Sequence, residues 1–181
     1  MADTLYSNVM LDLETMGNGP DAAIVAIGAC TFDITAGKVG ATYYGRVNLA
    51  SSVAHGGVID AGTVTWWLQQ GDDARAEIAR EGMGIAETLQ SFGAWMAQHT
   101  HDVEVWGNGA NFDNVILRGA YARIGTPAPW NWWNDRCYRT VKALHRDVPM
   151  ERLGTHHNAL DDAISQALHL IRMLNQAPLP E

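Results

Sequence analysis

Two acidic residues, Asp12 and Glu14, stand one residue apart inside an apolar run over residues 9–15. Side chains alternate between the faces of a β-strand, so a strand here would place both carboxylates on one face. Adjacent carboxylates on a buried strand repel each other and are costly to remove from water. A divalent cation between them would remove both penalties. The pair therefore predicts a strand that forms part of a metal site.

Length and composition predict a single globular domain over residues 1–181. The chain is 47% apolar and 18% charged, which is ordinary for a soluble protein of this size. No segment reaches the roughly 18 consecutive apolar residues of a membrane span, so we expect no membrane partner. The start of the chain does not resemble a signal peptide, and Cys30 and Cys137 lack zinc-site spacing. We therefore expect reduced thiols and a cytoplasmic location.

The charge is negative but uneven. The net charge of -8 argues against non-specific duplex binding, which depends on many phosphate contacts. One stretch, residues 136–152, has the opposite sign, because five basic residues outnumber two acidic ones. Two interpretations stay open for it, a solvated helix face and a phosphate-binding edge. The basic residues are Arg136, Arg139, Lys142, Arg146 and Arg152.

The apolar pattern predicts an α/β domain. Three strands come first and follow one another through short turns, as in an antiparallel meander. Helices alternating with strands come next, so we expect a mixed sheet flanked by helices. The predicted strands are 9–13, 23–32, 41–47, 103–106 and 135–138. The predicted helices are 63–70, 73–80, 85–98, 111–124 (capped by Asn111), one ending near 142, and 158–174.

Three further acids stand near the starts of predicted helices. Asp113 opens a helix in mid-chain, and Asp161 and Asp162 open the last one, just after His156 and His157. Each has an ordinary explanation on its own, because an acid in a first turn stabilises the helix dipole. Together with the pair on the first strand, they form a set that these explanations do not cover.

The order of these motifs resembles the DEDD exonuclease superfamily, in the branch whose fifth residue is a histidine (DEDDh). The motifs are Asp-x-Glu on a strand, Asn-Phe-Asp at a helix, and His-Asn-Ala-Leu-Asp-Asp-Ala at the last helix. The resemblance covers about residues 9–174 and implies a ribonuclease H-like fold. Within the superfamily, the sequence most resembles phage exonucleases and bacterial exoribonucleases that act 3′ to 5′. The expected setting is then the cytoplasm of a bacterium or a phage-infected cell.

The resemblance assigns the metal ligands and the general base. Spacing leaves two choices open: the family pattern selects Asp162 as the fourth acid, whereas helical spacing from His157 favours Asp161, unless His157 lies on a loop. His156 is likewise the alternative to His157. The matching metal ligands are Asp12, Glu14, Asp113 and Asp162, and the matching base is His157.

The implied chemistry is hydrolysis from the 3′ end, with release of nucleoside 5′-monophosphates. Two Mg²⁺ or Mn²⁺ ions about 4 Å apart would suit four oxygen ligands. Our hypothesis is that Asp12 bridges both ions, that Glu14 and Asp162 complete one site, and that Asp113 supports the other. His157 would take the proton from the attacking water.

The expected substrate is single-stranded DNA or RNA with a free 3′ end, and the resemblance also allows a homodimer. A tryptophan could stack on a base, while Met16 suits either a base contact or the core. A Pro-rich loop with Trp130, Trp132 and Trp133 predicts a hydrophobic rim or a dimer contact. The candidate substrate contacts are Thr15, Met16, Trp66, Trp67 and Asn111.

Three other functions fit the sequence less well. A dinucleotide-binding fold would need a helix after Gly17 and Gly19, but a strand pattern follows. A ribonuclease H-like endonuclease distributes its acids differently and lacks the histidine motif. A non-catalytic module that binds strand ends would be expected to lack one of the five residues, and all five are present.

Overall fold

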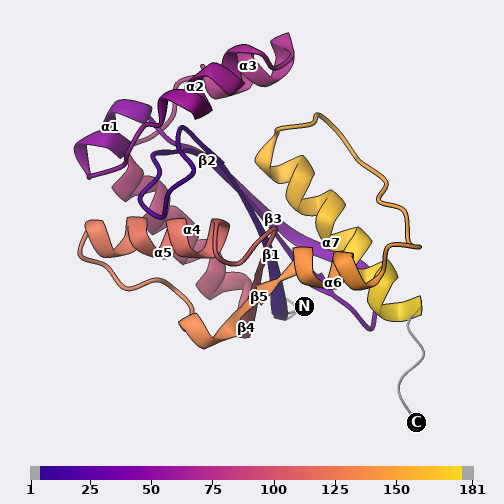
Figure 1. Ribbon diagram of the computed structural model, residues 1–181. Helices are drawn as coiled ribbons and strands as arrows, with labels where there is room; N and C mark the ends of the chain where they lie inside the picture. The colour runs from indigo at the N-terminus through magenta and orange to yellow at the C-terminus, as the bar shows by residue number, and fades with distance from the viewer. Residues whose placement is uncertain (1–4, 177–181) are drawn as a thin grey trace.

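The computed structural model describes residues 5–176, which form a five-stranded sheet with helices on both faces (Figure 1). The strands lie in the order β3-β2-β1-β4-β5, so β1 is the central strand. The strands are β1 (Tyr6–Thr15), β2 (Ile24–Asp33), β3 (Lys38–Arg46), β4 (Thr100–Gly107) and β5 (Asp135–Cys137).

The pairing confirms the predicted mixed sheet. β1, β2 and β3 form an antiparallel meander, and β4 and β5 add to the other edge of β1 in parallel. Short turns connect the antiparallel strands, whereas helical crossovers connect the parallel ones. The central strand β1 therefore has a neighbour on each side, and its carboxyl end extends beyond its last pairing with β4, between Leu11 and Gly107.

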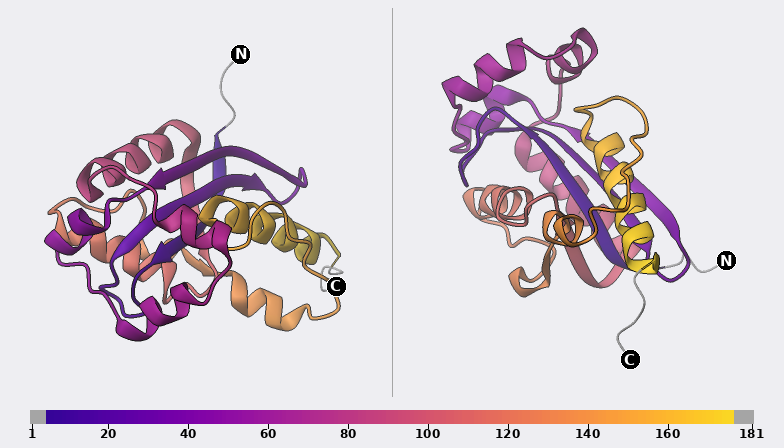
Figure 2. Two further views of the ribbon diagram at one scale, coloured as in Figure 1. Left: turned by 90° about the horizontal axis from the view of Figure 1, so that it is seen from above. Right: turned by 45° about the vertical axis from the view of Figure 1, so that its right-hand side comes forward.

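Helices cover the two faces of the sheet unequally. α4 and α5 pack on one face around Leu11, Leu89 and Leu117, while α7 crosses the other face (Figure 2). The short helices α1, α2 and α3 gather past one end of the sheet. The helices are α1 (Leu49–Ala54), α2 (Ala61–Leu68), α3 (Asp72–Ile78), α4 (Ile85–His99), α5 (Asp113–Arg123), α6 (Tyr138–Leu144) and α7 (Ala159–Gln176), with a 3-10 turn η1 (Trp132–Asn134).

Two helix predictions were wrong in detail. The prediction missed α1, which has only six residues and begins after Asn48, whose side chain accepts a hydrogen bond from Ser51 N. Asn111 does not cap α5, because a turn from Gly109 to Phe112 precedes the helix and the first helical residue is Asp113. A short helix carries too little periodicity to be recognised, and a cap two residues early is within the usual error of boundaries.

The tryptophans of the Pro-rich loop divide between core and surface. Trp130 is buried, and its indole N–H donates to Asp135 Oδ1 at 2.8 Å, so its prediction as a rim residue was wrong. Trp132 and Trp133 remain 67% and 59% exposed. Among the described residues, no helix combines the length and the apolar character needed to cross a membrane.

Candidate active site

Asp12 and Glu14 project from the face of β1 that α7 covers. Across the β1–β2 ladder, Asp12 is paired with Gly28 and Glu14 with Ala26. These small neighbours leave space above the strand pair. The alternation expected from the sequence is therefore present, with Leu11 and Leu13 packed in the core on the opposite face.

A missing side chain at Gly28 lets the start of α7 lie directly on β2. A Cβ at this position would stand only 2.1 Å from the carbonyl carbon of Ala159. The first turn of α7 is thereby held against the strand opposite Asp12. This close contact brings Asp162 to the pair on β1, and one carboxylate oxygen from each of Asp12, Glu14 and Asp162 lies within 4.8 Å of the others.

Asp113 enters the same site from the other helix layer, around the end of β4. Its Oδ1 accepts a hydrogen bond from Leu13 N at 3.2 Å, a backbone group that β4 no longer reaches. Gly107 permits this approach, because a Cβ there would stand 2.4 Å from Asn114 Oδ1 and 3.1 Å from Asp113 Cβ. All four predicted acids therefore surround one cavity.

Burial makes three of the acids, Asp12, Glu14 and Asp113, hold protons more tightly than usual. Burial raises the pKa of Asp12 well above its ordinary value, and the neighbouring carboxylates raise it further. Burial and then the charges of Asp162 and Asp113 raise the pKa of Glu14 to about 8. Burial raises the pKa of Asp113 to about 7, although backbone N–H groups and Arg139 oppose this shift. Such a cluster strongly favours binding of a cation.

Two polar neighbours that sequence reasoning missed hold individual carboxylates. Gln166 Nε2 donates to Asp12 Oδ1 at 2.7 Å, and Arg152 Nη1 donates to Asp162 Oδ1 at 2.6 Å. Gln166 follows Asp162 by four residues, so both face the sheet from successive turns of α7. That spacing in the sequence could have indicated Gln166 as a site residue. Arg152 lies on the loop before the helix, where no sequence pattern relates it to the acids.

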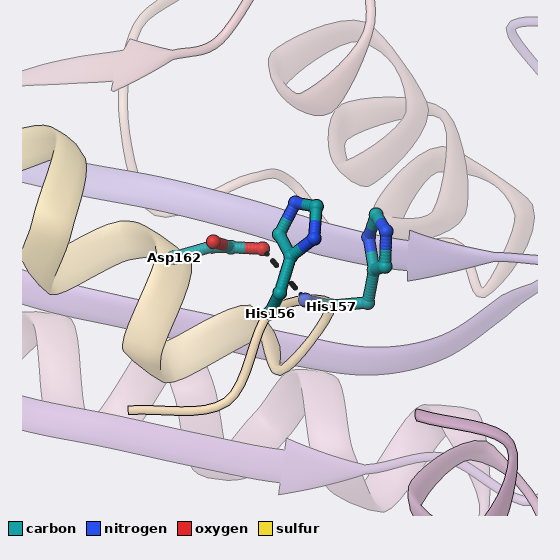
Figure 3. Close-up of side chains that lie close together, drawn as sticks. All are labelled: His156, His157 and Asp162. Atoms are coloured by element: carbon teal, nitrogen blue, oxygen red, sulfur yellow. Dashed lines mark hydrogen bonds between the residues drawn. The ribbon is translucent and has the colours of Figure 1, made fainter. Parts of the chain in front are cut away.

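Asp162 and Asp161 have different hydrogen-bond partners. Asp162 Oδ2 accepts a hydrogen bond from His157 N at 3.1 Å (Figure 3). Asp161 Oδ2 instead accepts one from Thr155 N in the preceding loop. His157 lies on that loop with a left-handed φ of 64°, and Asn158 Oδ1 accepts from the first N–H groups of α7. The spacing objection to Asp162 assumed that His157 is helical, so it no longer applies.

Both histidine rings reach the cavity and contact each other. The rings of His156 and His157 are stacked with centroids 3.7 Å apart. Trp66 and Trp67 hold the His157 ring edge-on, with centroid distances of 5.0 and 5.9 Å. Burial, and then the charge of His156, lowers the pKa of His157. His157 is therefore neutral at neutral pH and able to accept a proton.

The five predicted substrate contacts have different surroundings. Thr15, Met16 and Trp67 are buried: the Thr15 hydroxyl donates to Gly17 O, the Trp67 indole donates to Thr15 O, and Met16 packs beside Trp67. These side chains serve packing beneath the site. Trp66, with 41% exposure, and the exposed Asn111 are the two that present side-chain surface to solvent.

The cavity has a volume of about 220 Å³, and side chains of both charges line it. The four acids are one set. The cations are Arg139, Lys142 and Arg152, which belong to the basic stretch recognised in the sequence, and Arg152 pairs with Asp162. A cluster of oxygen ligands beside cations suits a phosphate ester held by metal ions.

Comparison with known proteins gives one family match. The model of the family described as 3′-5′ exoribonuclease Rv2179c-like domain matches residues 7–174. Comparison with the curated proteins found no match.

Several solved structures share the fold at low sequence identity. The nuclease domain of 3′hExo, a DEDDh family member bound to rAMP, has a TM-score of 0.63 and 16% identity over 96% of this chain and 94% of that chain. A 3′-exonuclease that recognises the 3′ end of histone mRNA stem-loop has a TM-score of 0.61 and 14% identity over 96% and 84%. E. coli exonuclease I with a dT13 oligonucleotide gives 0.61 and 16%, over 93% of this chain and 40% of that chain.

Proposed function

The chain belongs to the family of 3′-5′ exoribonuclease Rv2179c-like domains and is a 3′-5′ exonuclease, and from this premise we propose a two-metal-ion mechanism for it. The observation that carries the proposal is the convergence of Asp12, Glu14 and Asp162, with oxygen atoms within 4.8 Å of one another. Asp113 lines the same cavity. Four carboxylates with no cysteine among them suit hard divalent ions such as Mg²⁺ or Mn²⁺.

The four acids divide between the two proposed ions. Asp12, which interacts with the three other acids, would be a ligand of both ions; Glu14 and Asp162 would complete one site, and Asp113 would support the second. When bound, such ions activate a water and offset the negative charge that develops on the phosphate. Gln166 keeps one oxygen of Asp12 oriented, and backbone N–H of Leu13 orients Asp113.

His157 acts as the general base in this proposal. Its lowered pKa keeps the ring neutral at neutral pH, and Trp66 and Trp67 hold the ring at the cavity. A positioned base of this kind contributes roughly 10²- to 10⁴-fold to the rate. Replacement of His157 by Ala should therefore lower kcat by that factor while divalent-ion affinity, measured by calorimetry, stays nearly unchanged. His156→Ala is the matched control, and an equal loss there would move the base to His156.

The proposed substrate is single-stranded RNA or DNA with a free 3′ end. The family description favours RNA, while the structural relatives include one protein bound to rAMP and one bound to dT13. Trp66 offers an exposed indole face beside His157, where a terminal base would stack for about 1–3 kcal/mol. Asn111, which is exposed and precedes Asp113 by two residues, is a second candidate contact.

Degradation of end-labelled strands tests the function directly. Single-stranded RNA and DNA labelled at the 5′ end should shorten stepwise in Mg²⁺ or Mn²⁺, release nucleoside 5′-monophosphates, and stay intact in excess chelator. Internal cuts would instead indicate a ribonuclease H-like endonuclease. Binding without any shortening would indicate a module that only holds strand ends. Relative rates on the two polymers give the sugar preference.

We propose in addition that the protein forms a homodimer through the loop that carries Trp132 and Trp133. Both indoles are mostly exposed, and their rings contact each other edge-on at 5.8 Å. Exposed aromatic pairs are more common at protein interfaces than on free surfaces. Light scattering should give twice the chain mass, and Trp132→Ala combined with Trp133→Ala should halve it. A monomeric mass for the unaltered protein would reject this proposal.

A further inference from the structure

The basic side chains of the protein fall into two groups. Most arginines form an ion pair with a nearby carboxylate. Five basic residues form none within residues 5–176: Lys38, Arg123, Arg139, Lys142 and Arg146. The last three are exposed and follow one another over residues 139–146. We name these three residues the α6 row, since two lie on α6 and the third follows it. The paired arginines are Arg46, Arg75, Arg80, Arg118, Arg136, Arg152 and Arg172.

The α6 row starts at the acid cluster and leads away from it. Arg139 lines the cavity, donates to Asn108 O at 2.6 Å and lowers the pKa of Asp113, so it stands nearest the acids. Lys142 also lines the cavity, with Nζ 6.0 Å from the centre of the Tyr138 ring. Arg146 lies beyond the end of α6, outside the cavity lining. α6 contacts α7, which carries Asp162 (Figure 1).

We propose that the α6 row binds the backbone phosphates of the nucleotides that precede the 3′-terminal one. The proposal rests on the proposed function, which places the bond to be cut at the acids. A chain of net charge -8 repels a polyanion, so a strand needs a local positive path to approach four carboxylates. Exposed cations without carboxylate partners supply that path, and they release counterions when phosphates bind. Such contacts hold the strand without reading its sequence.

The competing explanation is that these cations only offset the charge of the acid cluster. Arg139 does so, since it lowers the pKa of Asp113. Within residues 5–176, Lys142 and Arg146 form no ion pair with any of the four acids, whereas Arg152 pairs with Asp162. Lys142 therefore distinguishes the two explanations, because it lies at the cavity without a carboxylate partner.

The chain provides its own control, because Lys38 and Lys142 are its two lysines. Both are exposed, and neither forms an ion pair among the described residues. Lys38 lies at the start of β3, outside the cavity lining. Lys38→Ala and Lys142→Ala therefore change the net charge equally and differ only in position.

The experiment compares a 12-nucleotide single strand with a dinucleotide that has one phosphodiester bond and no upstream phosphate. For the 12-nucleotide strand, Lys142→Ala should lower kcat/KM roughly three- to tenfold and reduce the slope of log kcat/KM against log salt by about 0.7. For the dinucleotide, Lys142→Ala should change kcat/KM by less than about twofold. Lys38→Ala should leave kcat/KM unchanged for both substrates. Arg146→Ala should behave like Lys142→Ala.

Two results would overturn the proposal. One is a Lys142→Ala variant that matches Lys38→Ala on the long strand. The other is an equal loss on both substrates, which would place the effect of Lys142 at the bond being cut. If the unaltered protein cuts neither substrate, the proposed function fails. Anisotropy of the labelled 12-nucleotide strand, measured for the same variants in chelator, then decides the phosphate contacts without any hydrolysis.

Discussion

The two halves of α7 pack on the same face of the sheet but contribute differently, one to the apolar core and the other to the candidate active site. Its carboxyl-terminal half packs Leu170, Ile171 and Met173 against Met10 and other apolar residues of the sheet. Its amino-terminal half instead places Asp162 and Gln166 above the acids of β1. The two environments are adjacent on the sheet. The apolar pair Met10–Cys30 and the pair Asp12–Gly28 are neighbours on the same face, two residues apart along β1.

This contrast shows where stability is gained and where it is lost. Burial of the apolar half removes hydrocarbon from water, at about 25 cal/mol per Å². Burial of the polar half concentrates carboxylates whose pKa values are raised, which destabilises the metal-free protein. A single helix of 18 residues is stiff enough for one end to anchor the other. The apolar half therefore holds Asp162 where repulsion alone would move it away.

The largest expected effect comes from neutralising the centre of the polar half. Asp12→Asn should lower hydrolysis by more than about 10²-fold, because the bridging carboxylate is lost. The same change should raise the melting temperature of the metal-free protein by a few degrees at pH 8, since it removes a buried charge that three neighbours repel. Activity assays and calorimetry measure the two effects. Full activity in the variant would contradict the site, and a lower melting temperature would contradict the repulsion.

The opposite change removes packing from the apolar half. Leu170 is fully buried, so Leu170→Ala should cost about 2–5 kcal/mol of unfolding free energy in urea. Hydrolysis per folded molecule should fall much less than in Asp12→Asn, because no ligand is altered. The pair of variants would thus separate stability from chemistry. A Leu170→Ala protein that stays folded but is as inactive as Asp12→Asn would show that the two halves are not separable.

The sequence predicted much of this contrast because its signals are local. Alternation in residues 9–15 was enough to place two acids on one face, and the motif at residues 157–162 located the fourth acid. The contact between Gly28 and Ala159 could not be predicted, since it joins distant segments and its only trace is a small residue. Burial of Trp130 was missed for a different reason: its hydrogen-bond partner Asp135 is only five residues away, but the loop between them has no recognisable pattern.

The pH dependence of stability tests the raised pKa values of the acids beneath the polar half of α7. The pKa of Glu14 is about 8 and that of Asp113 about 7, above their ordinary values of 4.5 and 3.8, so the folded state retains protons that the unfolded chain has lost. Their stabilising contribution is complete below about pH 4 and is lost as pH rises through 7 to 8. The pKa of His157 is lowered from 6.5, which acts in the opposite direction below that pH.

The window from pH 6.5 to 8.5 therefore isolates the acids. The melting temperature of the metal-free protein should fall across it by several degrees, at about 2–4 °C per kcal/mol for a chain of this size. Saturating Mg²⁺ should flatten the curve, since ions bind the deprotonated acids more tightly as pH rises. Asp12→Asn should make the curve less steep without Mg²⁺, because it removes one acid with a raised pKa while Glu14 and Asp113 remain. A metal-free curve that rises with pH would contradict the raised pKa values.

Gln166, at the boundary between the two halves, should show the smallest effect. Its Nε2 donates to Asp12 Oδ1, but its Oε1 is buried and has no partner among the described residues. Gln166→Leu loses the bond to Asp12 and also removes an unsatisfied carbonyl, so stability should change by less than about 1 kcal/mol. Hydrolysis and Mg²⁺ affinity should fall about tenfold, because Asp12 is no longer oriented.

A second substitution at the same position separates orientation from charge. Gln166→Glu keeps the size of the side chain but replaces the donor with a fifth acid beside Asp12. It should lower the melting temperature of the metal-free protein at pH 8, where Gln166→Leu does not. If Gln166→Leu leaves both hydrolysis and Mg²⁺ affinity unchanged, the bond to Asp12 is only a consequence of packing. The boundary between the apolar and polar halves of α7 would then lie between Asp162 and Gln166.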